Sequence, residues 1–580
     1  MGEGRIQVQR WICSSSVVRA VALAAMCVVG RVAFADALAV VDPLPLPGPY
    51  AVGCSNVAQD FSRVGPNETA KEYWEGFPDD NGRPRYVTDL LSDPADTLLY
   101  TVTPPDDREL YVNHATQPVA FALLVCYPTT SDNPRPDYAL PGGLSVPHMQ
   151  QGGDPPLWPD ATTRWPVLEF SHGLTGSPIS NDYIVALTTL ASYGYVVVAP
   201  FHGDPRFADV TIDNLVDLLL AILQIPDFVE MQAIRPLSMV SALDLVLSRP
   251  EYSDHVDPAR IAGFGASLGG ETMLLLGGAQ LTTTIGQSSK QVIVDPRLKA
   301  IVGYVPYFGQ LFYPAFGRNW NGLDSMTLPF LGISGTADTT APLAATLIGF
   351  GQLTNSRDLV ALVGVGHAFD YPSAPDIFTW TLTFFAAHAL DDRLARARIA
   401  RMTSVSGGGD DVLLVDYTAP AALDPGEADT IEYYNAALGH YFITAFPEEA
   451  AMLDAGIIVP GWTRTGFEFK SWTLDSGHGL PACRFFGTPG VGPNSHFFTI
   501  DAAECAYVRA NPLWTFEGYA FDEEPPIAGD CAPDRVLVVR LYNNGMGGQA
   551  SHRFLTSKSE MVEMLGAGWM IEGTVFCASP

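Results

Sequence analysis

The middle of the chain alternates short, almost wholly apolar segments with stretches of helical character. Strands inside a parallel sheet are covered on both faces, so their sequences are continuously apolar. Seven segments fit this description: 119–127, 167–171, 195–199, 260–264, 299–305, 329–334 and 358–363. Their alternation with helices, the last at 375–389, predicts a doubly wound, mostly parallel α/β domain over residues 107–402.

The remaining parts of the chain differ from this pattern. With 580 residues, the chain is too long for one hydrophobic core. Residues 36–106 are rich in Pro, Asp and Gly, and we expect an N-terminal surface segment there. Residues 403–429, which include a run of three glycines, are predicted to be a linker. Residues 430–580 then form a smaller, β-rich domain.

One interval within the α/β domain is longer than a simple crossover requires. About 60 residues separate the strands at 195–199 and 260–264, and residues 236–248 supply the expected helix. The remaining segment, 205–234, is an insertion with an apolar stretch from Leu215 to Ile225. It is either an extra helix on the core or a lid beside an active site.

The C-terminal part contains an internal repeat. Three histidines 56 residues apart each precede aromatic residues, and a Trp follows in each copy: His440, His496 and His552. Three such units predict a pseudo-threefold module whose copies pack on one another. The repeated aromatic residues form the core of the module or a face that binds a polymer or glycan. Repeat equivalence explains the spacing of the histidines without a metal ion.

The N-terminus has the pattern of an export signal. Three arginines within the first 19 residues precede an apolar run at 20–30, and Ala33-Phe34-Ala35 supplies small residues for cleavage. The run is much shorter than the roughly 20 residues that span a bilayer. We predict a signal peptide over 1–35, a protein secreted to the periplasm or the cell exterior, and no membrane span.

Six cysteines lie outside this signal. An even number of cysteines in an exported chain favours disulfides, and the absence of a Cys-x-x-Cys pair argues against structural zinc. We predict the pairs that keep each bond within one domain: Cys54–Cys126, Cys483–Cys505 and Cys531–Cys577.

The composition excludes two classes of protein. The chain is 47% hydrophobic and 11% aromatic, which is enough apolar material for packed cores and excludes a mostly disordered chain. The formal net charge is −31, whereas proteins that bind nucleic acid need a basic surface. We therefore expect no nucleic-acid partner.

A nucleophile motif lies between a predicted strand and a predicted helix. Gly265-Ala266-Ser267-Leu268-Gly269 contains Gly-x-Ser-x-Gly, after the strand at 260–264 and before a helical stretch from Glu271. The glycines permit a tight turn that exposes the serine at its tip. A serine needs a base to accept its proton, and a third group to orient that base. Ser267 is the predicted nucleophile.

The base and the acid are expected after later strands of the sheet. His367 follows the strand at 358–363, and Asp338 follows the strand at 329–334, which produces the order Ser267, Asp338, His367. The alternatives are His388 for the base and Asp324 or Asp370 for the acid. The oxyanion of the tetrahedral intermediate needs backbone N–H donors, which we assign to Leu268 and Leu174, with His172 as a structural residue.

Four segments resemble those of bacterial dienelactone-hydrolase-like esterases and the platelet-activating-factor acetylhydrolase group: Phe170-Ser171-His172-Gly173-Leu174, Tyr193–Pro200, the Gly-x-Ser-x-Gly motif and Gly366-His367. The resemblance covers residues 110–390. It implies an α/β-hydrolase fold and hydrolysis of short or activated acyl esters without a metal or other cofactor. The chain departs from dienelactone hydrolases, which have Cys as the nucleophile. The acetylhydrolases have their acid after the strand that follows the nucleophile. The chain departs from them because that position here, Val305-Pro306-Tyr307, holds no carboxylate. The C-terminal repeats resemble an uncharacterised three-repeat module of secreted bacterial hydrolases.

These observations favour a secreted carboxylic ester hydrolase that works through an acyl-enzyme. Its substrate would be a lipid ester, a small ester or a polyester. Two alternatives stay open, because a serine triad does not choose between ester and amide bonds. One is a serine peptidase on the same fold, and the other is a binding protein with a vestigial hydrolase domain.

Overall fold

The computed structural model describes most of the chain in two compact units, one over Val40–Ala422 and one chiefly over Leu423–Ser579. The described residues are 39–64, 73, 85–92, 97–180, 182–208, 225–311, 313–420, 422–456, 460–546 and 550–580. The predicted signal peptide over 1–35 and the apolar stretch over 215–224 lie outside these residues. No helix in the described ranges has the length and apolarity needed to cross a membrane.

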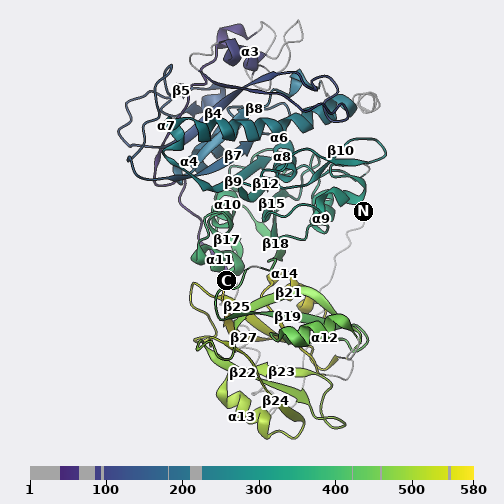
Figure 1. The fold of residues 1–580 in the computed structure, drawn as a ribbon. Coiled ribbons are helices and arrows are strands. Elements are labelled where there is room, and N and C mark those ends of the chain that lie inside the picture. Colours follow the sequence, from purple (N-terminus) through teal and green to yellow (C-terminus); the bar gives the residue numbers. More distant parts are fainter. Residues whose placement is uncertain are drawn as a thin grey trace, which may run out of the picture. The chain divides into compact units, whose positions relative to one another are not determined.

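A ten-stranded sheet forms the centre of the first unit (Figure 1). Its strand order is β18 (Asp411–Tyr417), β16 (Arg357–Leu362), β15 (Phe330–Gly335), β12 (Leu298–Tyr304), β9 (Val256–Ala266), β7 (Trp165–Ser171), β8 (Val196–Phe201), β4 (Val119–Thr129) and β2 (Ala51–Cys54), with β3 (Leu98–Val102) beside β4. The six strands from β16 to β8 are parallel. All seven predicted strands are present, and the sheet is mostly parallel as predicted.

Helices cover both faces of this sheet. One face packs against α4 (Tyr183–Ser192) and α10 (Ala374–His388), and the other against α6 (Ile225–Ser248), α8 (Leu268–Leu276) and α9 (Leu343–Phe350). Figure 1 shows α6 lying across the strands. Successive residues of a strand point to opposite faces. Accordingly, Val197 of β8 contributes to the first core, and Val196 and Val198 contribute to the second. This burial on both faces explains the continuously apolar strands.

Three of the predicted segments differ from the structure. Residues 36–106 are more than a surface segment, because β2 and β3 both pair with β4 in the central sheet. Residues 403–429 are not simply a linker, because β18 pairs antiparallel with β16 and forms an edge of the sheet. β2 and β3 have four and five residues, and the apolar run of β18, at 412–415, follows a glycine-rich stretch typical of a linker. The insertion predicted over 205–234 is also too long, because α6 already begins at Ile225.

The second unit repeats one order of elements three times: strand, strand, helix, strand. The segments are β19 (Glu427–Asn435), β20 (His440–Thr444), α12 (Pro447–Ala455) and β21 (Trp462–Trp472), then β22 (Leu480–Gly487), β23 (His496–Thr499), α13 (Ala502–Ala510) and β24 (Trp514–Glu523), then β25 (Val536–Tyr542), β26 (His552–Leu555), α14 (Lys558–Gly566) and β27 (Met570–Ala578). The strands form one six-stranded and one three-stranded sheet.

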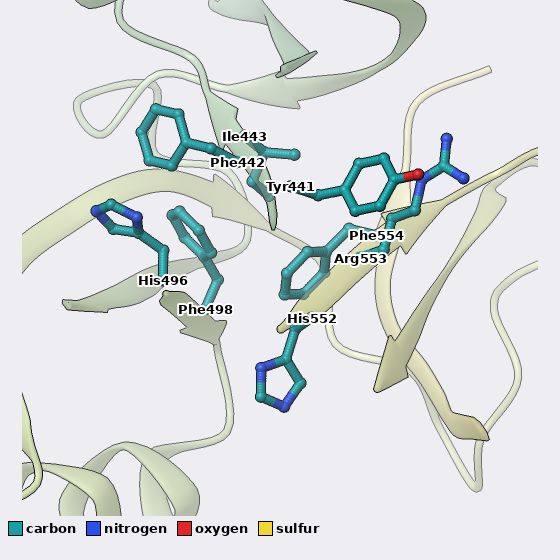
Figure 2. Close-up of a pocket in the computed structure, with 8 residues that line it drawn as sticks. All are labelled: Tyr441, Phe442, Ile443, His496, Phe498, His552, Arg553 and Phe554. Carbon is teal, nitrogen blue, oxygen red and sulfur yellow. The ribbon is translucent and has the colours of Figure 1, made fainter. Parts of the chain in front are cut away.

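One set of repeated aromatic residues, the second residue after each repeated histidine, lies in the interior of this unit. Phe442, Phe498 and Phe554 are at most 5% exposed, and Figure 2 shows them together where β20, β23 and β26 approach one another. The ring centroids of Phe498 and Phe554 are 5.6 Å apart. Burial lowers the pKa of His552 to about 3, so this ring is neutral. These positions favour the interpretation of the repeated aromatics as a packed core over that of an exposed binding face.

Three disulfides join the six described cysteines. The pairs are Cys54–Cys126, Cys483–Cys505 and Cys531–Cys577, as predicted. The first joins β2 to β4, and each of the other two lies within the second unit. The first bond ties the N-terminal segment to the central sheet.

Candidate active site

A sharp turn between β9 and α8 exposes Ser267. Its backbone has φ 55° and ψ −119°, a strained conformation for a residue other than glycine. The end of β12 supports the turn from behind, since the Ser267 N–H donates to the carbonyl of Tyr304 and the N–H of Tyr307 donates to the carbonyl of Ser267. The segment after β12, which carries no acid, thus anchors the turn.

The glycines beside Ser267 leave no room for a side chain. A Cβ on Gly265 would lie 2.1 Å from the carbonyl oxygen of Gly269, and a Cβ on Gly269 would lie 1.9 Å from that of Ser171. Both contacts are with backbone atoms that side-chain rotation cannot move. The strand, the turn and the loop after β7 therefore pack directly against one another.

We expect Gly269→Ala to lower the free energy of unfolding by at least about 3 kcal/mol, because the added methyl group forces apart the turn and the end of β7. Urea unfolding followed by circular dichroism measures the effect. Gly153→Ala is the matched control, since a Cβ at Gly153 meets nothing within 4 Å. Equal unfolding midpoints for the two variants would contradict the close packing of the turn.

The three predicted catalytic side chains are joined by two hydrogen bonds, both made by His367. His367 Nε2 is 2.8 Å from Ser267 Oγ, and His367 Nδ1 is 2.7 Å from Asp338 Oδ2. Asp338 follows β15 and His367 follows β16, so all three project from the carboxyl ends of parallel strands. This is the edge at which open α/β sheets bind their ligands.

The backbone holds the Asp338 carboxylate in place. Its Oδ1 accepts hydrogen bonds from the N–H groups of Thr340 and Ala341 at 2.8 and 2.9 Å, and the side chain is fully buried. The His367 ring is 29% exposed, so one edge remains open to solvent. A buried carboxylate bonded to one ring nitrogen sets the tautomer that leaves the other nitrogen free to accept a proton.

The structure places the alternative acids and base in other surroundings. Asp370 accepts hydrogen bonds from the N–H and Oγ of Ser373 before α10. Asp324 ends a short 3-10 helix, Arg318–Leu323. His388 lies in α10 with its ring against Phe384, and burial lowers its pKa to about 4. In contrast, His367 bonds both Asp338 and Ser267, so the geometry favours Asp338 and His367.

The two predicted oxyanion donors lie beside Ser267. Leu268 is the first residue of α8, and its N–H therefore has no acceptor within the helix. Gly173 lies close to the nucleophile, since a Cβ there would be 3.3 Å from Ser267 Cβ. The next residue is Leu174, which is 37% exposed. Both N–H groups thus belong to backbone that flanks the serine.

The N–H groups of the residues before and after Leu174 both have hydrogen-bond acceptors within the protein. The N–H of Gly173 donates to Tyr183 Oη at 3.1 Å, and the N–H of Thr175 donates to Asp204 Oδ2 at 2.8 Å. Within the described part of the chain, no acceptor is found for the N–H of Leu174. Of the three successive amides, Leu174 has the one available to a ligand.

His172 is a structural residue in this arrangement. Its Nε2 accepts a hydrogen bond from the N–H of His202 at 3.2 Å, which places the proton on Nδ1, 2.8 Å from the carbonyl of Gly173. Burial and, secondarily, the nearby Arg235 lower the pKa of His172 to about 3. A ring with so low a pKa is a weak base, and both of its nitrogens already have hydrogen-bond partners, so it is not available to accept a proton from the nucleophile.

Arg235 and Asp204, which are not among the predicted site residues, form a buried ion pair behind the loop at 172–175. Arg235 lies in α6 and is 0% exposed, and Asp204 lies just after β8 and is 1% exposed. The sequence feature that could have indicated this pair is an arginine within a largely apolar helical segment, because a buried charge needs a partner. Arg235 was overlooked because it lies between the predicted insertion at 205–234 and the predicted helix at 236–248.

Glu271 is a buried acid on α8, four residues after the nucleophile. It is 1% exposed, and Gln232 Nε2 donates to both of its oxygens at 2.7 Å. Burial raises its pKa to about 8, compared with 4.5 for an ordinary glutamate. The folded protein therefore keeps a proton that the unfolded chain loses, and the stability falls as the pH rises from about 4.5 to about 8.

We expect Glu271→Gln, which cannot ionise, to be more stable than the parent protein at pH 9 by an amount on the order of 2 kcal/mol, and equally stable at pH 4.5. Thermal unfolding at the two pH values measures the difference. Glu251→Gln, on the partly exposed helix α7 (Pro250–Ser253), is the control for the replacement of a carboxylate by an amide. A constant difference between Glu271→Gln and the parent would contradict the prediction.

Family models match two parts of the chain. Residues 152–213 match the platelet-activating factor acetylhydrolase, isoform II, model, and residues 429–579 match a domain of unknown function, DUF5648. A search of curated proteins found no match. The first match includes the loop at 172–175 and supports a hydrolase similar to the acetylhydrolases, of the lipase or esterase kind. The second covers almost all of the C-terminal unit and assigns it no activity.

Proposed function

We propose that the protein is a serine carboxylic ester hydrolase, with Ser267 as nucleophile, His367 as general base and Asp338 as the orienting acid. The observation that carries the proposal is the continuous pair of hydrogen bonds from Ser267 Oγ through His367 to Asp338, at 2.8 and 2.7 Å. The strained turn at Ser267 and the partial match to the acetylhydrolase model support the same function.

The proposed reaction proceeds through an acyl-enzyme. His367 Nε2 accepts the proton of Ser267 Oγ as the oxygen attacks the ester carbonyl carbon. The carbonyl oxygen becomes an oxyanion, and the N–H groups of Leu268 and Leu174 donate to it. The intermediate then expels the alcohol, which takes the proton from His367. Water, deprotonated by His367, attacks the acyl-enzyme, and His367 then returns the proton to Ser267 Oγ as the carboxylic acid leaves. Asp338 keeps its charge throughout and stabilises the imidazolium.

The C-terminal unit has a separate role in the proposal. Its three copies of one element order and its repeated buried aromatics support a pseudo-threefold accessory module. The proposal also includes secretion, which three disulfides support because such bonds persist in oxidising compartments.

A panel of esters and amides tests the function. The purified protein should hydrolyse p-nitrophenyl esters from acetate to palmitate, and the dependence of kcat/KM on chain length reports the size of the acyl site. Aminoacyl p-nitroanilides test the peptidase alternative in parallel. Turnover of anilides without turnover of esters would replace the esterase with a peptidase, and no turnover of either would leave a binding protein.

A further inference from the structure

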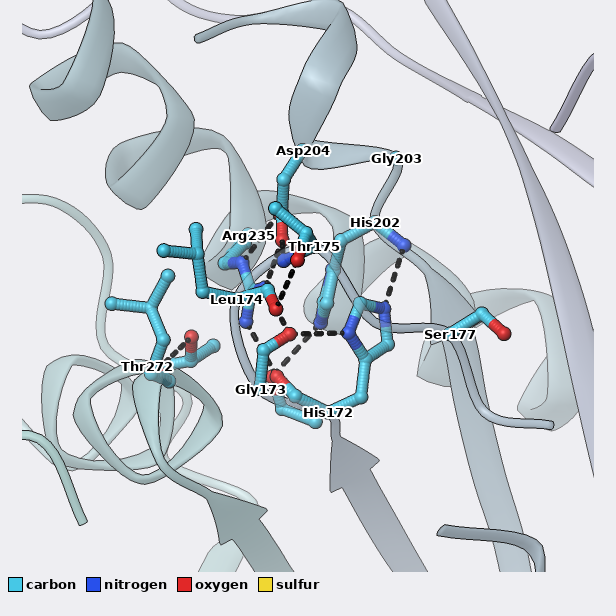
Figure 3. Close-up of polar contacts among 12 residues, drawn as sticks. His172, Gly173, Leu174, Thr175, Ser177, His202, Gly203, Asp204, Arg235 and Thr272 are labelled. Atoms are coloured by element: carbon cyan, nitrogen blue, oxygen red, sulfur yellow. Dashed lines mark hydrogen bonds and ion pairs between the residues drawn. The ribbon is translucent and has the colours of Figure 1, made fainter. Parts of the chain in front are cut away.

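The loop that carries Leu174 is held from behind by one buried side chain. Figure 3 shows Arg235 between Asp204 and the loop. The Nη1 of Arg235 donates to the carbonyl of His172 at 2.7 Å, and Nη2 donates to the carbonyl of Gly173 at 3.0 Å. The Nε and the same Nη2 pair with the two carboxylate oxygens of Asp204, at 2.8 and 2.5 Å. Arginine thus bonds two successive loop carbonyls and one acid at once.

These bonds fix the orientation of the Leu174 N–H. The Gly173–Leu174 peptide is trans and planar, so its N–H points opposite to its carbonyl. That carbonyl accepts hydrogen bonds from Arg235 and from His172 Nδ1, and more weakly from the N–H of Gly176 at 3.3 Å. The Leu174 N–H therefore points away from Arg235. A cation bonded to the carbonyl also polarises the peptide and strengthens its N–H as a donor.

The acid of the pair holds the following peptide. Asp204 Oδ2 accepts the N–H of Thr175 at 2.8 Å, and Thr175 has a positive φ of 57°. The hydroxyl of Thr175 donates to the Leu174 carbonyl at 2.8 Å. The peptides on both sides of Leu174 are thus fixed by the same ion pair. Leu174 is the residue between them whose N–H is free in the described part of the chain.

Stability alone is a weak reason for this ion pair. Moving two charges out of water costs about as much as their attraction returns, and a buried pair is often no more stabilising than apolar residues of equal volume. Here the remaining N–H groups of Arg235 bond the backbone of one loop. The geometry therefore indicates that the ion pair holds the backbone of that loop in one conformation.

We propose that Arg235 and Asp204 are positioning residues that orient and polarise the Leu174 N–H as an oxyanion donor. The inference rests on the proposed serine hydrolase function. Neither side chain touches the reacting atoms, so the pair acts on the chemical step through the backbone of residues 173–175. Loss of one oxyanion donor costs about 10²- to 10³-fold in kcat, and a misaligned donor should cost part of that.

The test compares Arg235→Lys with Arg297→Lys. Lysine keeps the charge at Arg235 but cannot bond both carbonyls and Asp204 together. Arg297 is a matched control, because it forms a similar two-pronged pair with Asp295, and neither residue contacts the loop. Asp204→Asn is the second variant in case Arg235→Lys does not fold, since asparagine still offers an acceptor to the N–H of Thr175.

Two readouts separate positioning from general damage. The first is the kcat and KM for p-nitrophenyl acetate. The second is the rate and the end point of Ser267 labelling by a fluorophosphonate, whose phosphoryl oxygen needs the same donors. We expect Arg235→Lys to lower kcat and the labelling rate about 10- to 100-fold, with KM within about threefold and an unchanged end point. Asp204→Asn should lower both about tenfold, and Arg297→Lys should change neither.

The outcomes distinguish the two proposals. A labelling rate and kcat that stay at the parent level in both Arg235→Lys and Asp204→Asn would overturn the inference and leave the esterase intact. A lower labelling end point at an unchanged rate would also overturn it, because that result reports partial unfolding. If the parent protein neither hydrolyses the ester nor reacts with the probe, the proposed function falls, and this inference falls with it.

Discussion

Replacing Ser267 with alanine is expected to lower kcat for p-nitrophenyl ester hydrolysis by at least about 10⁴-fold. The methyl group cannot attack the carbonyl carbon, and only stabilisation of the oxyanion and substrate binding remain. The variant should also lose labelling by a fluorophosphonate. Steady-state kinetics and mass spectrometry of the labelled protein measure the two effects. The variant should fold normally, because Ser267 is held through its backbone at Tyr304 and Tyr307.

Ser248→Ala is the matched control, since Ser248 ends α6 and its hydroxyl donates to the carbonyl of Leu245, away from the three predicted catalytic residues. It should leave kcat and labelling unchanged. Ester hydrolysis that persists in Ser267→Ala at the parent rate would exclude Ser267 as the nucleophile. Labelling at a different serine would identify another site.

The second large effect is expected for Asp338→Asn, which should lower kcat about 10⁴-fold with a small change in KM. The asparagine amide can donate to His367 Nδ1, which would place the imidazole proton on Nε2. That nitrogen could then no longer accept the proton of Ser267 Oγ at 2.8 Å. Kinetics with p-nitrophenyl acetate measure the loss.

Asp370→Asn is the comparison variant, because Asp370 is the alternative acid and bonds Ser373 rather than His367. We expect its kcat to stay within about twofold of the parent value. A large loss in Asp370→Asn together with a small loss in Asp338→Asn would reverse the assignment of the acid.

Local sequence was sufficient for the inner strands and for the order of the three site residues. Each inner strand is apolar on both faces, so its identity does not depend on which strand lies beside it. The turn at Ser267 was equally readable, because Gly265 and Gly269 are demanded by backbone contacts within a few residues of the turn and with the end of β7. The three side chains follow strand ends, and parallel strands present those ends at one edge.

Local sequence was insufficient where partners are distant. β2, β3 and β18 are short or mixed in polarity, and they are strands because β4 and β16 offer free edges. The sequences of residues 36–106 and 403–429 do not reveal that β4 and β16 have unpaired edges. The Arg235–Asp204 pair was not predicted because its members are 31 residues apart in the sequence. They also bond a third segment, at 172–175.

The sequence by itself determined the inner strands of the sheet, the strained turn at Ser267 and the succession of serine, aspartate and histidine. Each of these depends on the polarity, size or φ preference of neighbouring residues, and these are properties of the local chain. Only the tertiary structure decided which segments complete the edges of the sheet and which side chains hold the loop at Leu174. Those choices depend on hydrogen-bonding groups left free elsewhere and on the need of a buried charge for a partner. Both become defined only when distant segments meet.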